Sequence, residues 1–164
     1  MNILQEIAAY FCKGETGKPL VAVAQYREGQ KEEFSATGNV YSQYFSAESK
    51  IKVIADDGTA SASECLLGCM LDYGTVSLAD VCLINRNGVA KTYGKGIMQT
   101  TYYLTFVGEQ DAVTLTTATI HWPKTDTCIH GVGIEKTDEN DVKSVDDQNS
   151  ADAELNAALS AWGI

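Results

Sequence analysis

A thiol and an imidazole, Cys65 and His130, are the side chains best suited to chemistry. Cysteine hydrolases place a thiolate at the start of a helix and a histidine on a later strand, because the helix dipole and the imidazolium stabilise the thiolate. Cys65 falls near the start of an expected helix, and His130 falls on an expected strand. One hypothesis is therefore a cysteine hydrolase that uses Cys65 and His130, with His121 as the other candidate base.

Three observations favour a structural role for Cys65 instead. The residues on either side of it, Ser63-Glu64 and Leu66-Leu67, match no nucleophile signature. The carboxylate of Glu64 opposes a lowered thiol pKa, because like charges repel. Cysteine is also among the residues most often buried in cores. The preferred prediction is that the protein has no catalytic residue.

A zinc site is a weaker possibility. Cys65 and Cys69 lie four residues apart, and Cys128 and His130 would share one strand face, so together they could form a tetrahedral Cys₃His set. Neither spacing is that of the usual zinc knuckle. The segment 94–96, Gly-Lys-Gly, is too short for a phosphate-binding loop and is interpreted as a bend between strands. We predict no metal and no cofactor.

Three helices are expected from apolar residues at three- and four-residue spacing. They cover residues 2–13, 63–73 and 150–162, and the second begins at a capping Ser63 and ends before Gly74. The last helix carries an apolar stripe that would contribute roughly 1.5–3 kcal/mol for each large side chain buried. It is therefore expected to dock on the rest of the protein.

Strands are expected wherever β-branched and aromatic residues cluster between turn formers. Residues 27–33 are interpreted as a loop, residues 34–49 receive no assignment, and Asn87-Gly88 is typical of a tight hairpin turn. The strands are predicted at 20–26, 51–55, 76–84, 89–93, 97–107, 112–122 and 127–135. They follow one another as hairpins rather than as β-α-β units, which disfavours a dinucleotide-binding fold.

The pair 97–107 and 112–122 is the strongest hairpin signal in the chain. Alternation places Tyr102 with apolar neighbours on a core face. The opposite face is amphipathic and suits contact with another protein, although a solvated sheet face explains it equally well. The predicted interaction residues lie on this face and on the last helix: Thr101, Tyr103, Thr105, Leu155, Leu159 and Trp162.

Together these elements predict a β-rich α+β fold: an antiparallel sheet, sandwich or barrel of about six to eight strands with N-terminal, central and C-terminal helices. The 164 residues form one domain, in which an acidic segment, 135–149, precedes the C-terminal helix. No run is long and apolar enough for a membrane helix. The N-terminus lacks the basic residues of a secretory signal.

Charge and cysteine content bear on the partners. A formal net charge of −10 argues against direct binding to nucleic acid or to anionic membranes. Eight acidic and two basic side chains lie between residues 135 and 154. Five cysteines are an odd number in a chain that can build a core without disulfides. We therefore expect reduced thiols, and a location in the cytoplasm of a host cell or in a virion.

Three functions follow. The preferred hypothesis is a non-enzymatic subunit of a protein assembly, such as a phage tail tube, neck or head accessory protein, with protein partners and a homo-oligomeric state. The first alternative is the cysteine hydrolase. The second is an acidic inhibitor whose residues 135–154 mimic nucleic acid and bind a basic partner.

Overall fold

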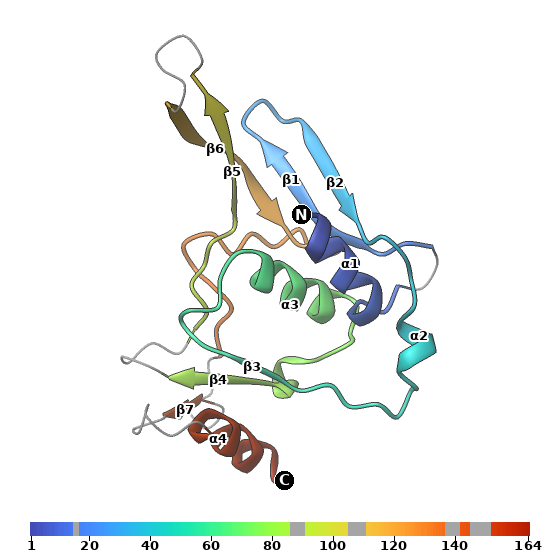
Figure 1. Cartoon of the computed structure of the whole chain (residues 1–164). Helices are drawn as coiled ribbons and strands as arrows, with labels where there is room; N and C mark the ends of the chain where they lie inside the picture. The colour runs from blue at the N-terminus through green and yellow to red at the C-terminus, as the bar shows by residue number, and fades with distance from the viewer. Residues whose placement is uncertain (15–16, 86–90, 105–110, 137–141, 145–151) are drawn as a thin grey trace.

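The computed structural model describes residues 1–14, 17–85, 91–104, 111–136, 142–144 and 152–164 (Figure 1). The helices are α1 (Asn2–Phe11), α2 (Tyr41–Tyr44), α3 (Ala62–Asp72) and α4 (Ala153–Trp162), with a 3₁₀ turn at Leu78–Asp80. The strands are β1 (Leu20–Tyr26), β2 (Lys31–Ser35), β3 (Val53–Ala55), β4 (Val81–Asn85), β5 (Ile97–Tyr103), β6 (Ala112–His121) and β7 (Val142–Ser144). No helix within the described ranges is both long and apolar enough to cross a membrane.

The strands form two sheets, which confirms the β-rich α+β class. One sheet is antiparallel with the order β2-β1-β6-β5, and the other is parallel with the order β3-β4-β7. The parallel sheet was not predicted. It forms because β3, α3 and β4 make a β-α-β crossover, in which the helix covers strands whose side chains are buried. The expectation of hairpins alone is therefore wrong.

Other strand predictions change as well. β2 occupies part of the expected loop 27–33, and turns replace the expected strand 127–135. Gly131 and Gly133 explain the turns, because their φ values of +77° and +85° interrupt an extended chain. The Asn87-Gly88 turn lies outside the described residues. Both described partners of β4 are parallel to it, and Lys91 and Thr92 pair with Glu135 and Ile134 instead of with β4.

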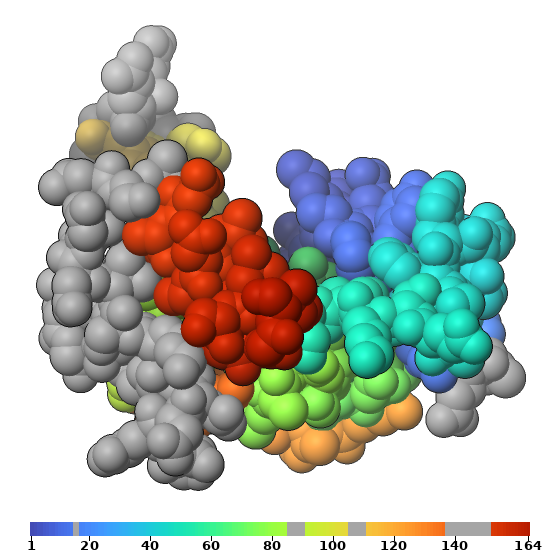
Figure 2. Space-filling view, turned by 90° about the horizontal axis from the view of Figure 1, so that it is seen from below, coloured from blue at the N-terminus to red at the C-terminus, as the bar shows by residue number. Residues whose placement is uncertain are grey.

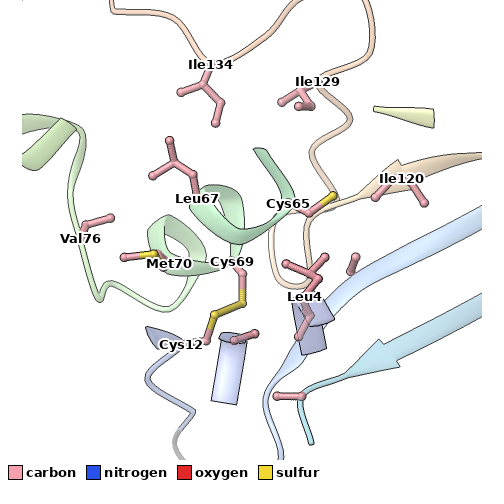
Figure 3. Close-up of a cluster of buried hydrophobic side chains, with 14 of the residues drawn as sticks. Leu4, Cys12, Cys65, Leu67, Cys69, Met70, Val76, Ile120, Ile129 and Ile134 are labelled. Atoms are coloured by element: carbon pink, nitrogen blue, oxygen red, sulfur yellow. A yellow bond between two sulfur atoms is a disulfide. The ribbon is translucent and has the colours of Figure 1, made fainter. Parts of the chain in front are cut away.

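Helix α3 lies at the centre of the main core, between the two sheets (Figures 1 and 3). Its buried residues face α1 on one side and the segment from β6 to Ile134 on the other. Figure 3 shows this cluster, which includes Leu4, Cys65, Leu67, Met70, Ile120 and Ile129. Because α3 contacts both sheets, its first turn is held firmly in place.

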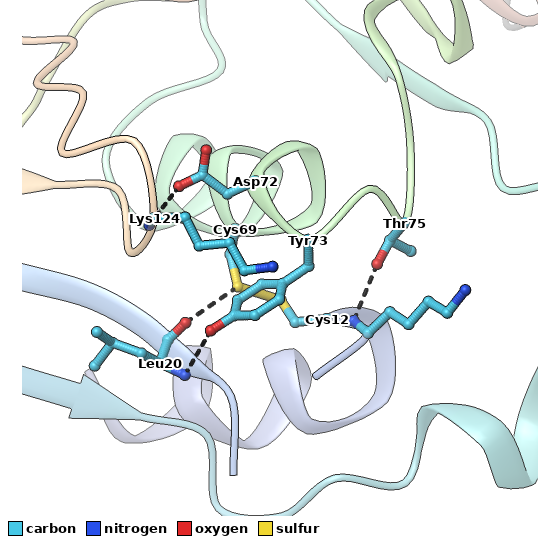
Figure 4. Close-up of a disulfide and its surroundings, with 8 residues drawn as sticks. Cys12, Leu20, Cys69, Asp72, Tyr73, Thr75 and Lys124 are labelled. Atoms are coloured by element: carbon cyan, nitrogen blue, oxygen red, sulfur yellow. Dashed lines mark hydrogen bonds between the residues drawn. A yellow bond between two sulfur atoms is a disulfide. The ribbon is translucent and has the colours of Figure 1, made fainter. Parts of the chain in front are cut away.

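A disulfide between Cys12 and Cys69 joins the end of α1 to α3 (Figure 4). The segment around it is cross-linked further: the Leu20 N–H donates to the Tyr73 hydroxyl at 3.0 Å, and the Lys13 N–H donates to Thr75 Oγ1 at 3.0 Å. The expectation that all five cysteines are reduced is therefore wrong. The two half-cystines are 57 residues apart in sequence, a distance at which local patterns carry no information about pairing.

Helix α4 docks on the parallel sheet, as expected for an apolar stripe. It lies at the surface beside the segments of the parallel sheet (Figure 2), and Ala158 packs against Cys82 and Ile84 in a second, smaller core. The Lys52 ammonium lies 5.5 Å from the ring centre of Trp162. This contact adds a cation–π attraction to the packing.

Candidate active site

A turn between β3 and α3 places Ser61 at the start of the helix. After β3 ends, Asp56 organises the turn: its N–H donates to Thr59 Oγ1, and its Oδ1 accepts the Gly58 N–H at 3.0 Å. Ser61 then adopts φ 57° and ψ −114°, a conformation that side chains disfavour. Such strain persists only where the surrounding structure enforces it, and it is concentrated at functional sites.

The buried carboxylate of Glu64 enforces this conformation. Its Oε2 accepts the N–H groups of Ser61 and of Lys95, both at 2.9 Å. Its Oε1 accepts the Thr92 hydroxyl at 2.6 Å and the Gly94 N–H at 2.7 Å. Glu64 is fully buried. One side chain thus fixes both the Ser61 turn and the loop that carries Lys95.

The segment 130–134 packs against the loop that carries Lys95. Thr92 and Ile134 exchange hydrogen bonds, since the Thr92 N–H donates to the Ile134 carbonyl and the Ile134 N–H donates to Thr92 Oγ1. A Cβ at Gly94 would lie 2.9 Å from the Gly133 nitrogen, and one at Gly96 would lie 2.7 Å from the His130 nitrogen. Both positions therefore require glycine, because the two backbones are in close contact.

Ser61 and Lys95 line the same cavity, which has a volume of about 450 Å³. Its other lining residues are Met1, Ala62, Cys65, Ile97, Met98, Gln99 and Ile120. The backbone nitrogens of Ser61 and Lys95 share one acceptor, so they are at most two hydrogen-bond lengths apart. Among the described residues, no carboxylate forms an ion pair with the Lys95 ammonium. The cavity thus contains a hydroxyl and an amine.

This arrangement suits nucleophilic catalysis. A serine hydroxyl becomes a nucleophile when a nearby base removes its proton, and a lysine amine serves as that base in Ser–Lys hydrolases. The Ala62 N–H opens α3 and has no intrahelical acceptor, because the first N–H groups of a helix lack one. The N–H of the residue after a nucleophilic serine is a usual donor of an oxyanion hole.

A larger cavity of about 630 Å³ beside α2 also contains serines and a lysine, Ser42, Ser46 and Lys13. Ser42 lies within the short α2, and Ser46 is bonded in a turn with Ser49. Neither has the positive φ of Ser61. Backbone strain and the shared carboxylate therefore single out the Ser61 cavity.

The cysteine and histidine of the first hypothesis do not meet in this cavity. Cys65 lines it, but burial and the Glu64 carboxylate raise the pKa of its thiol to about 11. His130 is exposed and does not line it. His121 lies 3.1 Å from an Asp126 carboxylate oxygen and bonds to Thr119 through Nε2. The structure offers no cysteine–histidine pair in which Cys65 is the nucleophile.

The zinc hypothesis also meets an obstacle. Cys69 is one of the four residues it required, and its sulfur is bonded to Cys12. In the part of the chain that the structure describes, no three ligand-type side chains gather as a metal site would require. The disulfide removes the thiolate that zinc binding needs.

The predicted interaction residues remain a prediction. Thr101 and Tyr103 are exposed on β5, and Tyr102 is also exposed, at 49%, rather than part of the core. Thr105 lies outside the described residues. On α4, Leu155 is exposed, whereas Leu159 and Trp162 are half-buried.

Sequence reasoning missed Ser61, Glu64 and Lys95 as a site. A signal was present, because Ser61 and Glu64 have the serine-x-x-glutamate spacing of a helix start. The cap that the sequence predicts is Ser63, two residues later. Lys95 was assigned to a bend between strands, and nothing in its local sequence connects it to a helix start so far away.

Comparison with known proteins identifies the family to which this arrangement corresponds. The profile of peptidase family S41 matches residues 2–139. Three solved structures resemble the fold: a photosystem II D1 C-terminal processing protease (TM-score 0.60, 21% identity), a putative S41 protease from Bacteroides fragilis (0.65, 14%) and a lipoprotein from Streptococcus agalactiae (0.56, 14%). No curated protein matches.

Each likeness covers nearly all of this chain but less than half of the solved structure. These likenesses cover 94%, 98% and 96% of this chain but only 33%, 40% and 47% of the three structures. The chain thus spans between a third and a half of their length. The match to a peptidase family contradicts the preferred hypothesis of a non-enzymatic phage assembly subunit. It also contradicts the alternative of an acidic inhibitor. The family match agrees better with the hydrolase alternative than with the preferred hypothesis.

Proposed function

Because the chain belongs to peptidase family S41, we propose that it carries the catalytic centre of a serine peptidase, with Ser61 as nucleophile and Lys95 as base. One observation supports this most strongly. The strained Ser61, at the start of a buried helix, faces the same cavity as Lys95, and Glu64 fixes both.

The reaction would proceed through an ester on Ser61. Lys95 Nζ, in its uncharged form, takes the proton of the Ser61 hydroxyl while Oγ bonds to the carbonyl carbon of a peptide. The helix N-terminus, with the Ala62 N–H, stabilises the oxyanion that forms. The C–N bond then breaks, and Lys95 gives its proton to the leaving amine. Water hydrolyses the ester by the reverse proton path, which restores Ser61.

Glu64 acts as a positioning residue in this scheme. Its carboxylate accepts backbone N–H groups on both sides of the site, so it does not contact the reacting atoms. Catalysis depends steeply on the alignment of nucleophile and base. A buried acceptor that holds both chain segments supplies this alignment.

The test is hydrolysis of a library of quenched fluorescent peptides by the full chain and its variants. Ser61→Ala and Lys95→Ala are expected to lower kcat/KM by at least about a thousandfold, the scale of losing a nucleophile or its base. Ser63→Ala is the matched control, because Ser63 is exposed on the same helical turn and does not line the cavity. Mass spectrometry of acid-quenched samples of the unmodified chain, taken during turnover, would locate an acyl group on Ser61. Cleavage that survives in Ser61→Ala would refute the proposal.

A further inference from the structure

The cavity beside α2 is separate from the Ser61 cavity and larger, with a volume of about 630 Å³. Small-molecule sites commonly have volumes of about 300–1,000 Å³. The residues that line this α2 cavity come from three places in the sequence: 13–14, the segment 39–47 and Tyr73. The two cavities share no lining residue, and no step of the proposed peptidase reaction uses the α2 cavity.

Aromatic rings form the apolar part of the α2 cavity. The rings of Tyr41 and Phe45 stack with their centres 5.1 Å apart, and the Phe45 ring lies 5.7 Å from that of Phe11 on α1. Tyr73 adds a third lining ring, and its hydroxyl is fixed because it accepts the Leu20 N–H (Figure 4). Aromatic rings prefer stacked or edge-to-face contacts with other rings. The wall therefore favours a ligand with a planar, apolar body.

The polar residues of the cavity are held in place without a ligand. The Lys13 N–H donates to Thr75 Oγ1 at 3.0 Å, directly after the half-cystine that joins α1 to α3. Asn39 Nδ2 donates to the Gly14 carbonyl at 3.0 Å, which connects the segment before α2 to the chain beyond α1. Such prior ordering reduces the entropy that a ligand loses on binding.

These polar groups also lack protein partners in the ranges that the structure describes. The Lys13 ammonium forms no ion pair there, and the Ser42 hydroxyl forms no hydrogen bond. Asn39 donates its amide to Gly14 and keeps its carbonyl oxygen as an open acceptor. No described carboxylate lines the cavity, although the chain has a formal net charge of −10. A cation and an acceptor are thus open to a ligand.

We propose that the α2 cavity binds a small aromatic carboxylate that carries an N–H or O–H donor. The carboxylate pairs with the Lys13 ammonium, and the donor reaches the Asn39 carbonyl oxygen. The ring packs against Tyr41, Phe45 and Tyr73. A polyanion does not suit this site, because one lining ammonium cannot offset the repulsion from an acidic protein. The proposal goes beyond the peptidase function and does not depend on Ser61.

Indole-3-acetate is the probe, because it combines a planar ring, an N–H donor and a carboxylate. Amide correlation NMR spectra of the full chain during a titration report both the affinity and the residues that respond. We expect a Kd of about 1 mM, as is usual for a ligand of this size, with shifts centred on Lys13, Tyr41 and Tyr73. Ser61→Ala should bind equally well. Shifts centred on the Ser61 cavity, or none that saturate by about 10 mM, would overturn the proposal.

Two analogues separate the contributions of charge and ring. Indole-3-acetamide keeps the shape and the N–H but lacks the charge, and it should bind about tenfold more weakly. Cyclohexylacetate keeps the charge but lacks the aromatic ring and the donor, and a loss of about fivefold or more is expected. Equal affinity of either analogue and indole-3-acetate would contradict the proposed recognition.

Substitution of Lys13 tests the protein side. Lys13→Met keeps most of the apolar stem and removes the ammonium, so it should weaken indole-3-acetate about tenfold and leave indole-3-acetamide unchanged. Lys18→Met is the matched control, because Lys18 is exposed in the same segment and does not line the cavity. Ala47→Trp, at an exposed lining position, should block both ligands. Equal weakening by the two methionine variants would assign the effect to net charge and refute the site.

Discussion

The indole of Trp122 lies directly over Gly68 in the middle of α3, so that a methyl group at position 68 would overlap the ring. Trp122 belongs to the partly buried shell of the main core, and its indole N–H has no acceptor among the described residues. The glycine therefore allows the helix that carries Ser61 to approach the end of β6.

Gly68→Ala is expected to lower the free energy of unfolding by about 1–3 kcal/mol, because the core is overpacked. Helix propensity alone predicts the opposite, a gain of about 1 kcal/mol for alanine. Urea unfolding followed by circular dichroism decides between the two signs. The control is Gly38→Ala, where the nearest atom would be 3.9 Å away. Recovery in a Gly68→Ala, Trp122→Leu double variant would confirm the cause.

Replacement of Glu64 should affect both stability and catalysis. Glu64→Ala leaves four donors, two of them buried and two part-buried, without their acceptor, at a cost of about 3 kcal/mol. Glu64→Gln keeps one acceptor oxygen and should be less damaging. In folded Glu64→Gln we expect kcat to fall more than KM rises, because alignment rather than binding is lost. A pure KM effect would contradict the positioning role.

The Cys65 thiol should react slowly with iodoacetamide in the native protein. Burial and the Glu64 carboxylate raise its pKa to about 11, so the thiolate fraction at pH 7 is very small. Labelling of Cys65, measured by peptide mapping, should increase about tenfold for each pH unit between 7 and 10. Complete labelling at pH 7 would show that the thiol is activated.

The Cys12–Cys69 disulfide should contribute about 2–4 kcal/mol to stability, as expected for a cross-link that restricts a loop of this length in the unfolded chain. Thermal unfolding with and without a phosphine reductant measures it. The Cys12→Ala, Cys69→Ala double variant is the control and should not respond to the reductant. Equal unfolding temperatures for the oxidised and reduced protein would mean that packing alone holds the two helices together.

The Asp80 carboxylate contributes to the free energy of unfolding by an amount that depends on pH. Burial raises the pKa of its carboxyl, but hydrogen bonds from Lys52 and Ser77 outweigh burial and lower it to about 2. Because the folded pKa is below the ordinary value of 3.8, the stabilisation is present above pH 3.8 and is lost as the pH falls through about 2.

Asp80→Asn is therefore expected to cost about 1 kcal/mol at pH 7, reduced by solvent screening, and almost nothing at pH 2. Urea unfolding of both proteins at the two pH values tests this. Asp57→Asn on the β3–α3 turn changes the same charge elsewhere and serves as control. A cost that does not vary with pH would assign the effect to packing.

Local sequence patterns predicted the elements that depend on neighbouring residues. The apolar spacing of α1 and α4 and the β-branched and aromatic runs of β5 and β6 identify these elements, because such residues favour a one-sided helix or an extended strand. The same pattern failed for residues 127–135. There Gly131 and Gly133 turn the chain, although the flanking residues favour a strand.

The tertiary structure alone decided the parallel sheet and the site. Glu64 and Lys95 are 31 residues apart in sequence, and they meet because α3 and the Lys95 loop pack around one buried carboxylate. The pairing of β3 with β4 and the Cys12–Cys69 bond also join residues that are far apart in sequence. Local periodicity records which face of an element is buried. The partner that buries it depends on how the whole chain packs, and only that packing brings a strained serine and a lysine into one cavity.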